Sequence, residues 1–352
     1  MARSWCLVAV LAILLGFSSA ATADPRQYWI DQLGLDRAWS TSDGTGVLVG
    51  LVDTGVDADD PGLAGALLPG TQFPDLGSGS VDARGHGTTM ALLIAGRGVD
   101  GGTVGVAPGA RIVPARLDGG PADAEAAIRW VVDRGAKVVN LSLGTAGGSA
   151  AYDEGLRYAR EHDVVVVAAA GNAATDVRVT SPADRRGVLA VSAVDRDGAF
   201  GEDVSVRGPE VALAAPGIGI ATSRRGGARP TSGTSQAAAI VSGVAALVRA
   251  RFPDLAADDV VRRLTATARD AGPPGRDERY GFGVVDPVAA LAPPPPSAVR
   301  SVGPPWLPAG GLVVALGVLA FRRRAHRAHN VPPTSARHSP TVRPHRTVKG
   351  ER

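Results

Sequence analysis

One histidine of this sequence has the surroundings of a catalytic base. Residues 24–321 contain only His86 and His162. His86 lies in the sequence Gly85-His86-Gly87-Thr88, and the flanking glycines allow another backbone or a substrate to approach the imidazole closely. His162 stands between two acidic residues before a Val-rich run, so we expect it at a solvated helix end. His86 is therefore the candidate general base.

An acidic residue ends a continuous apolar run nearer the N-terminus. Asp53 follows Val47–Val52 and begins the sequence Asp53-Thr54-Gly55. In an open parallel sheet the functional groups lie at the carboxyl ends of the strands. A carboxylate there can accept the Nδ1–H of an imidazole, fix its tautomer and stabilise its protonated form. The alternative interpretation is that Asp53 only caps a turn.

A serine begins a predicted helix that is rich in small residues. Ser235 follows Gly233-Thr234 and begins a predicted helix that extends to about Arg249. Free N–H groups and the positive end of the dipole at a helix N-terminus suit a nucleophilic hydroxyl and a developing oxyanion. The alternative is an ordinary N-cap serine. The order Asp, His, Ser along the chain is that of subtilisin, and it differs from chymotrypsin and the α/β-hydrolases.

Two further segments follow apolar runs that we predict to be strands. Asn172, in Ala170-Gly171-Asn172, is the candidate side-chain donor to an oxyanion. Ser142-Leu143-Gly144 ends the run 138–143 and is typical of an extended edge that pairs with a peptide.

Alternating apolar runs and amphipathic segments indicate the fold class. Continuous Val-rich runs separated by helices predict a doubly wound α/β fold, in which helices cover both faces of a parallel sheet. The predicted strands are 47–52, 112–116, 138–143, 164–169, 188–194 and 211–214, and the predicted helices include 90–94, 124–134, 152–161 and 235–249.

Composition excludes several classes of protein. Residues 24–321 hold 27 Arg or Lys and 33 Asp or Glu, so their net charge is near −6 and nucleic-acid binding is disfavoured. Cys6, the only cysteine, lies in the leader, so a mature chain would have no disulfide, no thiolate metal site and no cysteine nucleophile.

The two ends of the sequence predict export and membrane attachment. Residues 1–23 have the charge, the apolar run and the A-x-A site of a signal peptide, although an N-terminal anchor is the alternative. A Pro-rich linker, 292–305, precedes an apolar stretch, 306–321, that we interpret as a transmembrane helix; a buried helix is the alternative. The basic tail, 322–352, follows directly, which places the tail in the cytoplasm and the domain outside the cell membrane.

The motifs together resemble the subtilisin-like (S8) serine peptidases. The matching segments are Val52-Asp53-Thr54-Gly55-Val56, Gly85-His86-Gly87-Thr88, Gly105-Val106-Ala107-Pro108-Gly109-Ala110, Asn140-Leu141-Ser142-Leu143-Gly144, Ala170-Gly171-Asn172 and Gly233-Thr234-Ser235. The resemblance implies a peptidase domain, 46–291, that follows an N-terminal extension, 24–45. It implies that Asp53 orients His86, that His86 is general base and then acid, that Ser235 is the nucleophile and that Asn172 contributes to the oxyanion hole.

The resemblance also implies where a substrate binds. Ser142, Leu143 and Gly144 would form one wall of the pocket for the P1 residue, the substrate residue before the scissile bond. Ala169, Ala170 and Gly171 would form the opposite wall. Small apolar walls favour a modest uncharged P1 residue. No cofactor is required. Structural calcium is common in such enzymes, but no ligand set can be placed, and we expect the acidic run Asp57–Asp60 to be a solvated loop.

Within this family the chain most resembles the mycosins, membrane-anchored subtilases of type VII secretion systems. A predicted leader and span bracket the domain, and only about twenty residues precede its core. The sequence departs from the usual subtilase pattern at Asp60-Pro61, at Thr89-Met90, at Gln236 and at Ala239. The expected partners are a protein or peptide substrate and a type VII secretion membrane complex. The alternatives are a tethered degradative subtilase and a catalytically silent scaffold.

Overall fold

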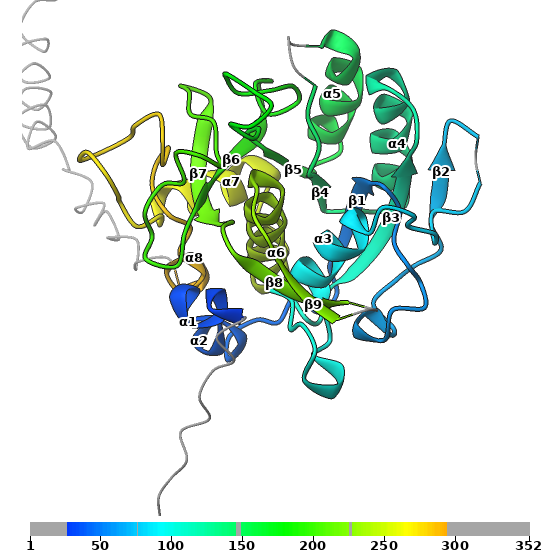
Figure 1. Ribbon diagram of the computed structural model, residues 1–352, viewed down its shortest axis with the longest axis horizontal. Coiled ribbons are helices and arrows are strands. Elements are labelled where there is room, and N and C mark those ends of the chain that lie inside the picture. Colours follow the sequence, from blue (N-terminus) through cyan, green and yellow to red (C-terminus); the bar gives the residue numbers. More distant parts are fainter. Residues whose placement is uncertain (1–26, 76, 146–148, 225–226, 294–352) are drawn as a thin grey trace, which may run out of the picture. The chain divides into compact units, whose positions relative to one another are not determined.

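A seven-stranded parallel sheet forms the centre of the molecule (Figure 1). The computed structural model describes residues 27–293 except 76, 146–148 and 225–226. The strand order is β2-β3-β1-β4-β5-β6-β7, and all six strand pairs are parallel. The strands are β1 (Leu48–Asp53), β2 (Thr71–Phe73), β3 (Arg111–Leu117), β4 (Val138–Leu141), β5 (Val165–Ala169), β6 (Val188–Val194) and β7 (Val211–Pro216).

Helices cover both faces of this sheet, as the sequence predicts. On one face lie α3 (His86–Ala95) and α6 (Thr234–Arg251), in one apolar cluster with the side chains of β1, β5 and β6 that point to that face. On the other face α4 (Pro121–Asp133) and α5 (Asp153–Glu161) form a second cluster with the alternate side chains of the same strands. Strands buried on both faces require apolar residues at every position, which explains the continuous Val-rich runs.

The central helix α6 is apolar on all sides because it is buried along almost its whole length. It packs on β4, β5, β6 and β7 and on α3. Alanine and glycine dominate it, so neighbouring backbones approach closely: a Cβ on Gly243 would lie 2.6 Å from the Cβ of Val106. The position of the first turn of α6 is therefore fixed by packing.

Several elements carry no clear sequence pattern and were not predicted. They are the edge strand β2, α1 (Trp29–Leu33), α2 (Leu35–Trp39), α7 (Ala257–Ala266), α8 (Pro287–Leu291), the antiparallel hairpin of β8 (Ile220–Arg224) and β9 (Gly227–Thr231), and short 3-10 turns at Pro61–Leu63, Val99–Gly101 and Ala150–Tyr152. The helices α1 and α2 join the main core, where Trp29 and Leu35 are fully buried.

The two ends of the described chain are fastened to the domain by hydrogen bonds. The Tyr28 hydroxyl donates to the carbonyl of Ile218 at 2.7 Å, and the Ser42 hydroxyl donates to the carbonyl of Leu247 at 2.9 Å. The guanidinium of Arg263 on α7 donates to the carbonyls of Ala290 and Ala292, at the end of α8.

The acidic run before the first 3-10 turn differs from the prediction of a solvated loop. Asp59 is exposed, but Asp60 is only 3% exposed. Its Oδ1 accepts the N–H of Gly62 at 3.0 Å, which caps the turn Pro61–Leu63. A local cap with proline behind it explains why Asp60-Pro61 is accommodated here.

The predicted signal peptide, the predicted span 306–321, the basic tail and most of the linker lie outside the described residues. No helix in the described part of the chain combines the length and apolarity needed to cross a bilayer.

Candidate active site

The candidate catalytic residues lie where the connections of the sheet change direction. From β1 the chain crosses to β2 and β3 on one side, and from β3 it crosses back to β4 on the other side of β1. Ligand sites of open α/β sheets form outside the carboxyl ends of the strands at such a switch point. Asp53 is the last residue of β1, and Ser142 directly follows β4.

Asp53 and His86 form a short hydrogen bond at this edge. The Nδ1 atom of His86 lies 2.7 Å from Oδ1 of Asp53, and the same oxygen accepts the N–H of Thr54 at 2.7 Å. The Asp53 side chain is 2% exposed and the imidazole is 36% exposed. The second oxygen, Asp53 Oδ2, is buried and has no hydrogen-bond partner among the described residues. The buried negative charge of Asp53 thus lies next to the imidazole, and the imidazole remains accessible to a substrate.

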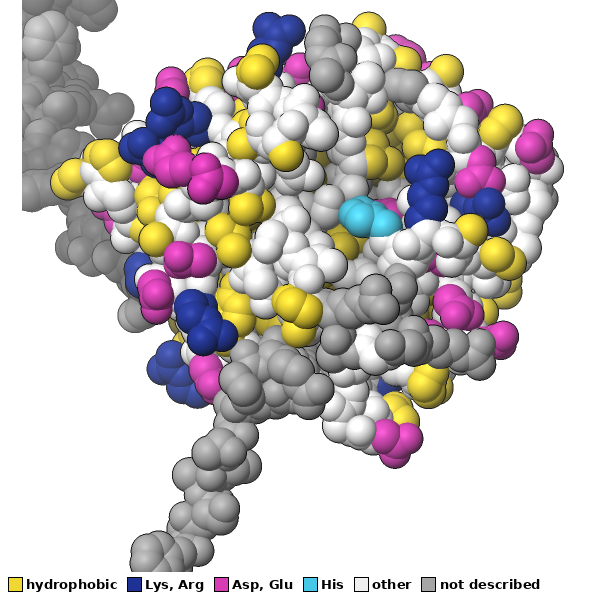
Figure 2. Space-filling model, in the orientation of Figure 1, with side chains coloured by type: hydrophobic (Ala, Val, Ile, Leu, Met, Phe, Trp, Pro, Cys, Tyr) yellow, Lys and Arg dark blue, Asp and Glu magenta, His cyan; other side chains and the backbone are white. Residues whose placement is uncertain are grey.

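Close backbone approach makes this pair possible. His86 begins α3, and the next residue, Gly87, lies against the turn after β1. A Cβ on Gly87 would lie 2.0 Å from the carbonyl oxygen of Gly55 and 3.2 Å from Cβ of Asp53. Only glycine fits there, which explains the Gly-His-Gly frame. Figure 2 shows a histidine side chain in a hollow of this face, with charged side chains mainly around the rim.

A second carboxylate, which sequence reasoning missed, supports the pair. Oδ1 of Asp82 accepts the hydroxyl of Thr54 at 2.8 Å, and its Oδ2 accepts the hydroxyl of Thr88 at 2.6 Å and the N–H of Thr88 at 2.8 Å. The hydroxyl of Thr54 in turn accepts the N–H of Gly87. Asp82 therefore joins the turn after β1 to the start of α3. An acid shortly before a helix start is a capping signal that could have identified it.

These charges determine the protonation of the imidazole. Burial acts most strongly on the pKa of His86 and lowers it, because a buried imidazolium loses hydration. The negative charge of Asp53, its hydrogen bond and the charge of Asp82 act in the opposite direction. Together they outweigh burial, so the pKa of His86 is raised above its ordinary value of 6.5.

Ser235 lies at the start of α6 and contacts the segment after β4. Its hydroxyl donates to the carbonyl of Ser142 at 3.2 Å, and the Ser142 hydroxyl donates to the carbonyl of Ser235 at 2.9 Å. This exchange ends β4 at Leu141, two residues earlier than predicted. Within the described residues no hydrogen bond joins Ser235 to His86. The structure thus brings Asp53 and His86 together and holds the Ser235 hydroxyl at the neighbouring strand, turned toward Ser142.

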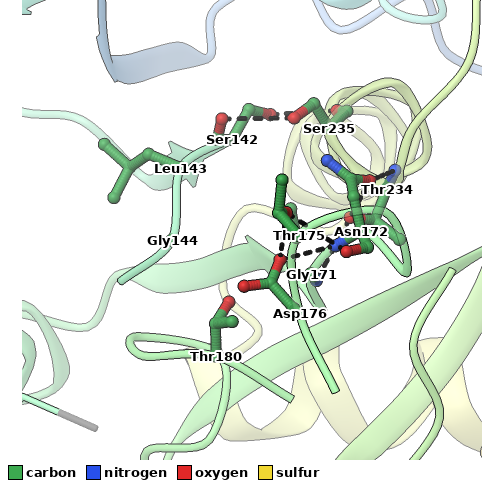
Figure 3. A pocket seen from close by; sticks show the side chains of 11 residues that line it. Ser142, Leu143, Gly144, Gly171, Asn172, Thr175, Asp176, Thr180, Thr234 and Ser235 are labelled. Atoms are coloured by element: carbon green, nitrogen blue, oxygen red, sulfur yellow. Dashed lines mark hydrogen bonds between the residues drawn. The ribbon is translucent and has the colours of Figure 1, made fainter. Parts of the chain in front are cut away.

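Asn172 lies beside Ser235 with a defined orientation. Its Oδ1 accepts the N–H of Thr234 at 3.0 Å and the hydroxyl of Thr234 at 3.2 Å. These donors identify Oδ1, and so leave the Nδ2 amide group on the side of Ser235 (Figure 3). The amide can therefore donate to the carbonyl oxygen of a substrate that is attacked by the Ser235 hydroxyl.

A cavity of about 420 Å³ opens beside Ser235 (Figure 3). Five of the six predicted wall residues line it: Ser142, Leu143, Gly144, Ala169 and Gly171. Ala170 does not; it is fully buried, and its carbonyl accepts the hydroxyl of Thr180 at 3.4 Å. Thr175, Asp176 and Thr180 also line the cavity, and sequence reasoning missed all three. These three residues lie in the connection after β5, which has no recognisable sequence motif. They line the pocket because this connection folds back toward it.

The remaining predictions concern single positions. His162 is exposed at the end of α5, as predicted, and its ring contacts that of Tyr158. Gln236 and Ala239 are buried in α6. The Gln236 amide donates to the Thr231 hydroxyl at 2.8 Å, so the departure from the usual subtilase pattern at Gln236 ties α6 to β9.

Among the described residues no group of three or more His, Cys, Asp or Glu is arranged to hold a metal ion.

Comparisons with known proteins found a matching family and several similar proteins. The profile of the Subtilase family matches residues 44–283. Mycosin-1 of Mycobacterium tuberculosis (strain ATCC 25618 / H37Rv) is 35% identical over 83% of this chain and 84% of its own length. The crystal structure of the MycP3 protease from the type VII (ESX-3) secretion system superimposes with a TM-score of 0.65 and 35% identity, over 77% of this chain and 90% of that one. Fervidolysin of Fervidobacterium pennivorans is 34% identical over 74% of this chain and 43% of its own length.

Proposed function

The chain belongs to the subtilase family and is a serine endopeptidase closely related to the mycosins, and we propose that it hydrolyses peptide bonds through Asp53, His86 and Ser235. The observation that carries this proposal is the 2.7 Å contact between Asp53 and His86, at the sheet edge where Ser235 also lies. A buried carboxylate on Nδ1 leaves Nε2 as the proton acceptor.

The proposed reaction begins when the Ser235 hydroxyl turns from the Ser142 carbonyl toward Nε2 of His86. The Ser235 oxygen then attacks the scissile carbonyl carbon while Nε2 takes its proton. The carbonyl electrons move onto oxygen, where the Asn172 amide and the N–H of Ser235 donate hydrogen bonds. His86 next protonates the leaving nitrogen as the C–N bond breaks, which leaves an acyl-enzyme on Ser235. Water, deprotonated by His86, hydrolyses this ester and restores the hydroxyl. No step requires a cofactor.

A fluorophosphonate probe tests this assignment, because it reacts only with an activated serine. We expect covalent labelling at Ser235, located by peptide mass spectrometry, and no labelling after His86→Ala. Ser242→Ala is the matched control, since Ser242 lies two turns along α6 and its hydroxyl donates to the carbonyl of Ala238. Labelling that survives loss of Ser235 would contradict the assignment of Ser235 and point to another activated serine. Absence of labelling in the folded wild type would favour a silent scaffold.

We also propose that the domain works outside the cell membrane, anchored by residues 306–321 with the basic tail in the cytoplasm. The sequence pattern supports this location. Mycosin relatives, among them one whose structure is described as an essential component of the type VII (ESX-1) secretion system, support association with such a system. Protease added to intact cell-wall-free cells should degrade the domain and spare a tag at Arg352. Loss of the tag and survival of the domain would reverse the proposed orientation.

A second candidate function is general protein degradation at the cell surface. The relative fervidolysin, whose structure is described as that of a keratinolytic enzyme, favours it. Incubation with casein and with the proteins secreted by the same cells separates the two functions. A secretion-associated peptidase should cut few secreted proteins at defined positions, whereas rapid digestion of casein to small peptides would favour degradation.

A further inference from the structure

The pocket beside Ser235 contains an uncompensated negative charge. Among the described residues that line it, Asp176 is the only one with an ionisable side chain. The remainder are small, hydroxylated or apolar residues and one amide, Asn172. No Arg or Lys of the described chain forms an ion pair with Asp176. The pocket therefore offers a single carboxylate to whatever side chain enters it.

Only one of the two oxygens of the Asp176 carboxylate accepts hydrogen bonds from the described residues. Its Oδ2 accepts the N–H of Asn172 at 3.0 Å and the hydroxyl of Thr175 at 2.9 Å. Its Oδ1 has no hydrogen bond among the described residues, and Figure 3 shows this oxygen directed away from both donors. The two bonds hold the side chain in place, because they leave it little rotational freedom. The free oxygen retains the capacity to accept from a ligand.

Thr180 lies between the two walls of the pocket, next to Asp176. A Cβ on Gly144 would lie 2.4 Å from the Thr180 hydroxyl oxygen, so Thr180 fills the space next to that wall. On the opposite wall, a Cβ on Gly171 would lie 3.2 Å from the Thr180 methyl and 3.3 Å from Oδ2 of Asp176. Thr180 and Asp176 thus lie together between the two walls, and a side chain that enters there meets both.

We propose that Asp176 makes this pocket selective for a P1 lysine or arginine. The inference rests on the proposed peptidase function and specifies its substrate class. An ammonium or guanidinium group supplies donors for Oδ1 and neutralises the charge, and both interactions are strengthened in a partly desolvated pocket. A P1 glutamate is repelled, and an apolar P1 residue leaves the carboxylate without a partner. This selectivity differs from the uncharged P1 residue that the small walls alone favour.

The test compares peptide amides that are identical except at P1, with Arg, Lys, norleucine, Ala or Glu at that position. Norleucine matches the length of lysine without its charge, so the Lys-to-norleucine ratio of kcat/KM isolates the charge. We expect a ratio of about 10 or more in the full-length enzyme, and a further loss with Glu. Asp176→Asn should reduce the ratio to near 1, because an amide oxygen can still accept from Asn172 and Thr175 while the charge is lost.

Asp203→Asn is the matched control for overall charge. Asp203 is exposed beside Val204, whose carbonyl accepts the N–H of Ala173, and it does not line the pocket. It should retain the wild-type ratio. Equal or better cleavage after norleucine by the wild type, or an unchanged ratio in Asp176→Asn, would overturn the inference while the peptidase function stands. Failure to cleave any of the five peptides together with absence of fluorophosphonate labelling would overturn both proposals.

Discussion

The two halves of the candidate site are built in different ways. The acid–base half consists of Asp53, His86 and Asp82. Hydrogen bonds hold it together: the imidazole contacts the carboxylate of Asp53, and hydroxyl and backbone N–H groups donate to the carboxylate of Asp82. The nucleophile half consists of Ser235 and Asn172. Ser235 belongs to a helix whose first 16 residues are all buried, and within the described residues its hydroxyl donates to one backbone carbonyl, that of Ser142.

The difference indicates that the two halves contribute different properties to the site. Buried carboxylates determine the charge and tautomer of the imidazole, because their electrostatic effect is strong where water is excluded. Dense packing determines the position of the nucleophile, because a buried helix cannot shift without opening a cavity or creating a clash. Substitutions in the acid–base half should therefore change proton transfer, whereas substitutions within α6 should change stability. The following predictions test this contrast, from the largest effect to the smallest.

Ser235→Ala should abolish turnover and leave the fold intact. In subtilisin itself, loss of the nucleophile costs about 10⁶-fold in kcat, and we take that magnitude as our expectation here. Removal of one buried hydroxyl that donates to a carbonyl at 3.2 Å should change the free energy of unfolding by about 1 kcal/mol. Single-turnover assays and urea unfolding measure the two quantities. Retained turnover would remove Ser235 from the mechanism.

Asp53→Asn should lower kcat by about 10⁴-fold, because an amide cannot hold the tautomer or stabilise the imidazolium. It should also lower the pKa of His86, since the charge and hydrogen bond of Asp53 raise it in the wild type. In the proposed mechanism neutral His86 is the base, so we expect wild-type activity to be lost as the pH falls through the raised pKa of His86. An NMR titration of His86, with His162→Gln to assign the signals, measures the shift. A rise in the pKa would contradict the electrostatic account.

Asn172→Ala should reduce kcat by about 10²–10³-fold with little change in KM, which is the effect measured for the equivalent donor in subtilisin. The donor is needed only when the oxyanion forms, so the loss should appear in the transition state. Thr234→Ser is the control, because it keeps the hydroxyl that orients the Asn172 amide. An increase in KM with unchanged kcat would instead place Asn172 in ground-state binding.

Asp82→Asn should shift the acid limb of the kcat/KM profile to lower pH by less than about one unit. The direction is the same as for Asp53, but the effect is smaller, because Asp82 makes the weakest of the contributions that raise the pKa of His86. Loss of an acceptor for the N–H and hydroxyl of Thr88 should also cost about 1 kcal/mol of stability. A profile identical to the wild type would confine Asp82 to a structural role.

Gly243→Ala should destabilise the protein by about 1–2 kcal/mol without changing the pH profile. The new methyl carbon would lie 2.6 Å from Cβ of Val106, and overpacking costs about 1–3 kcal/mol, offset in part by the better helix propensity of alanine. Gly120→Ala is the control, since no atom lies within 4 Å of its added Cβ. An altered pH dependence of activity in Gly243→Ala, with an unchanged free energy of unfolding, would contradict the proposed difference between the acid–base half and the nucleophile half.

The sequence predicted those parts of the site that local patterns encode. Asp53, His86 and Ser235 each end or begin an element with a clear apolar pattern, and glycine frames mark two of them. All six predicted strands and the four predicted helices occur, with ends shifted by a few residues.

The missed residues depend on tertiary structure. Asp176 and Thr180 lie in a polar connection whose return to β4 cannot be read from local periodicity. The helices α1 and α2 are five residues each, too short for a helical repeat, and they form because Trp29 and Leu35 are buried against α6 and its neighbours. The orientation of the Ser235 hydroxyl depends on one carbonyl, that of Ser142, which no sequence pattern specifies.

The fastening of α8 has a mechanical consequence. Tension applied to the chain beyond Pro293 reaches α8 first, where the guanidinium of Arg263 on α7 donates to two backbone carbonyls, those of Ala290 and Ala292. A force that pulls on the chain after Pro293 is therefore shared between α8 and α7, and it does not act on Ser235 directly.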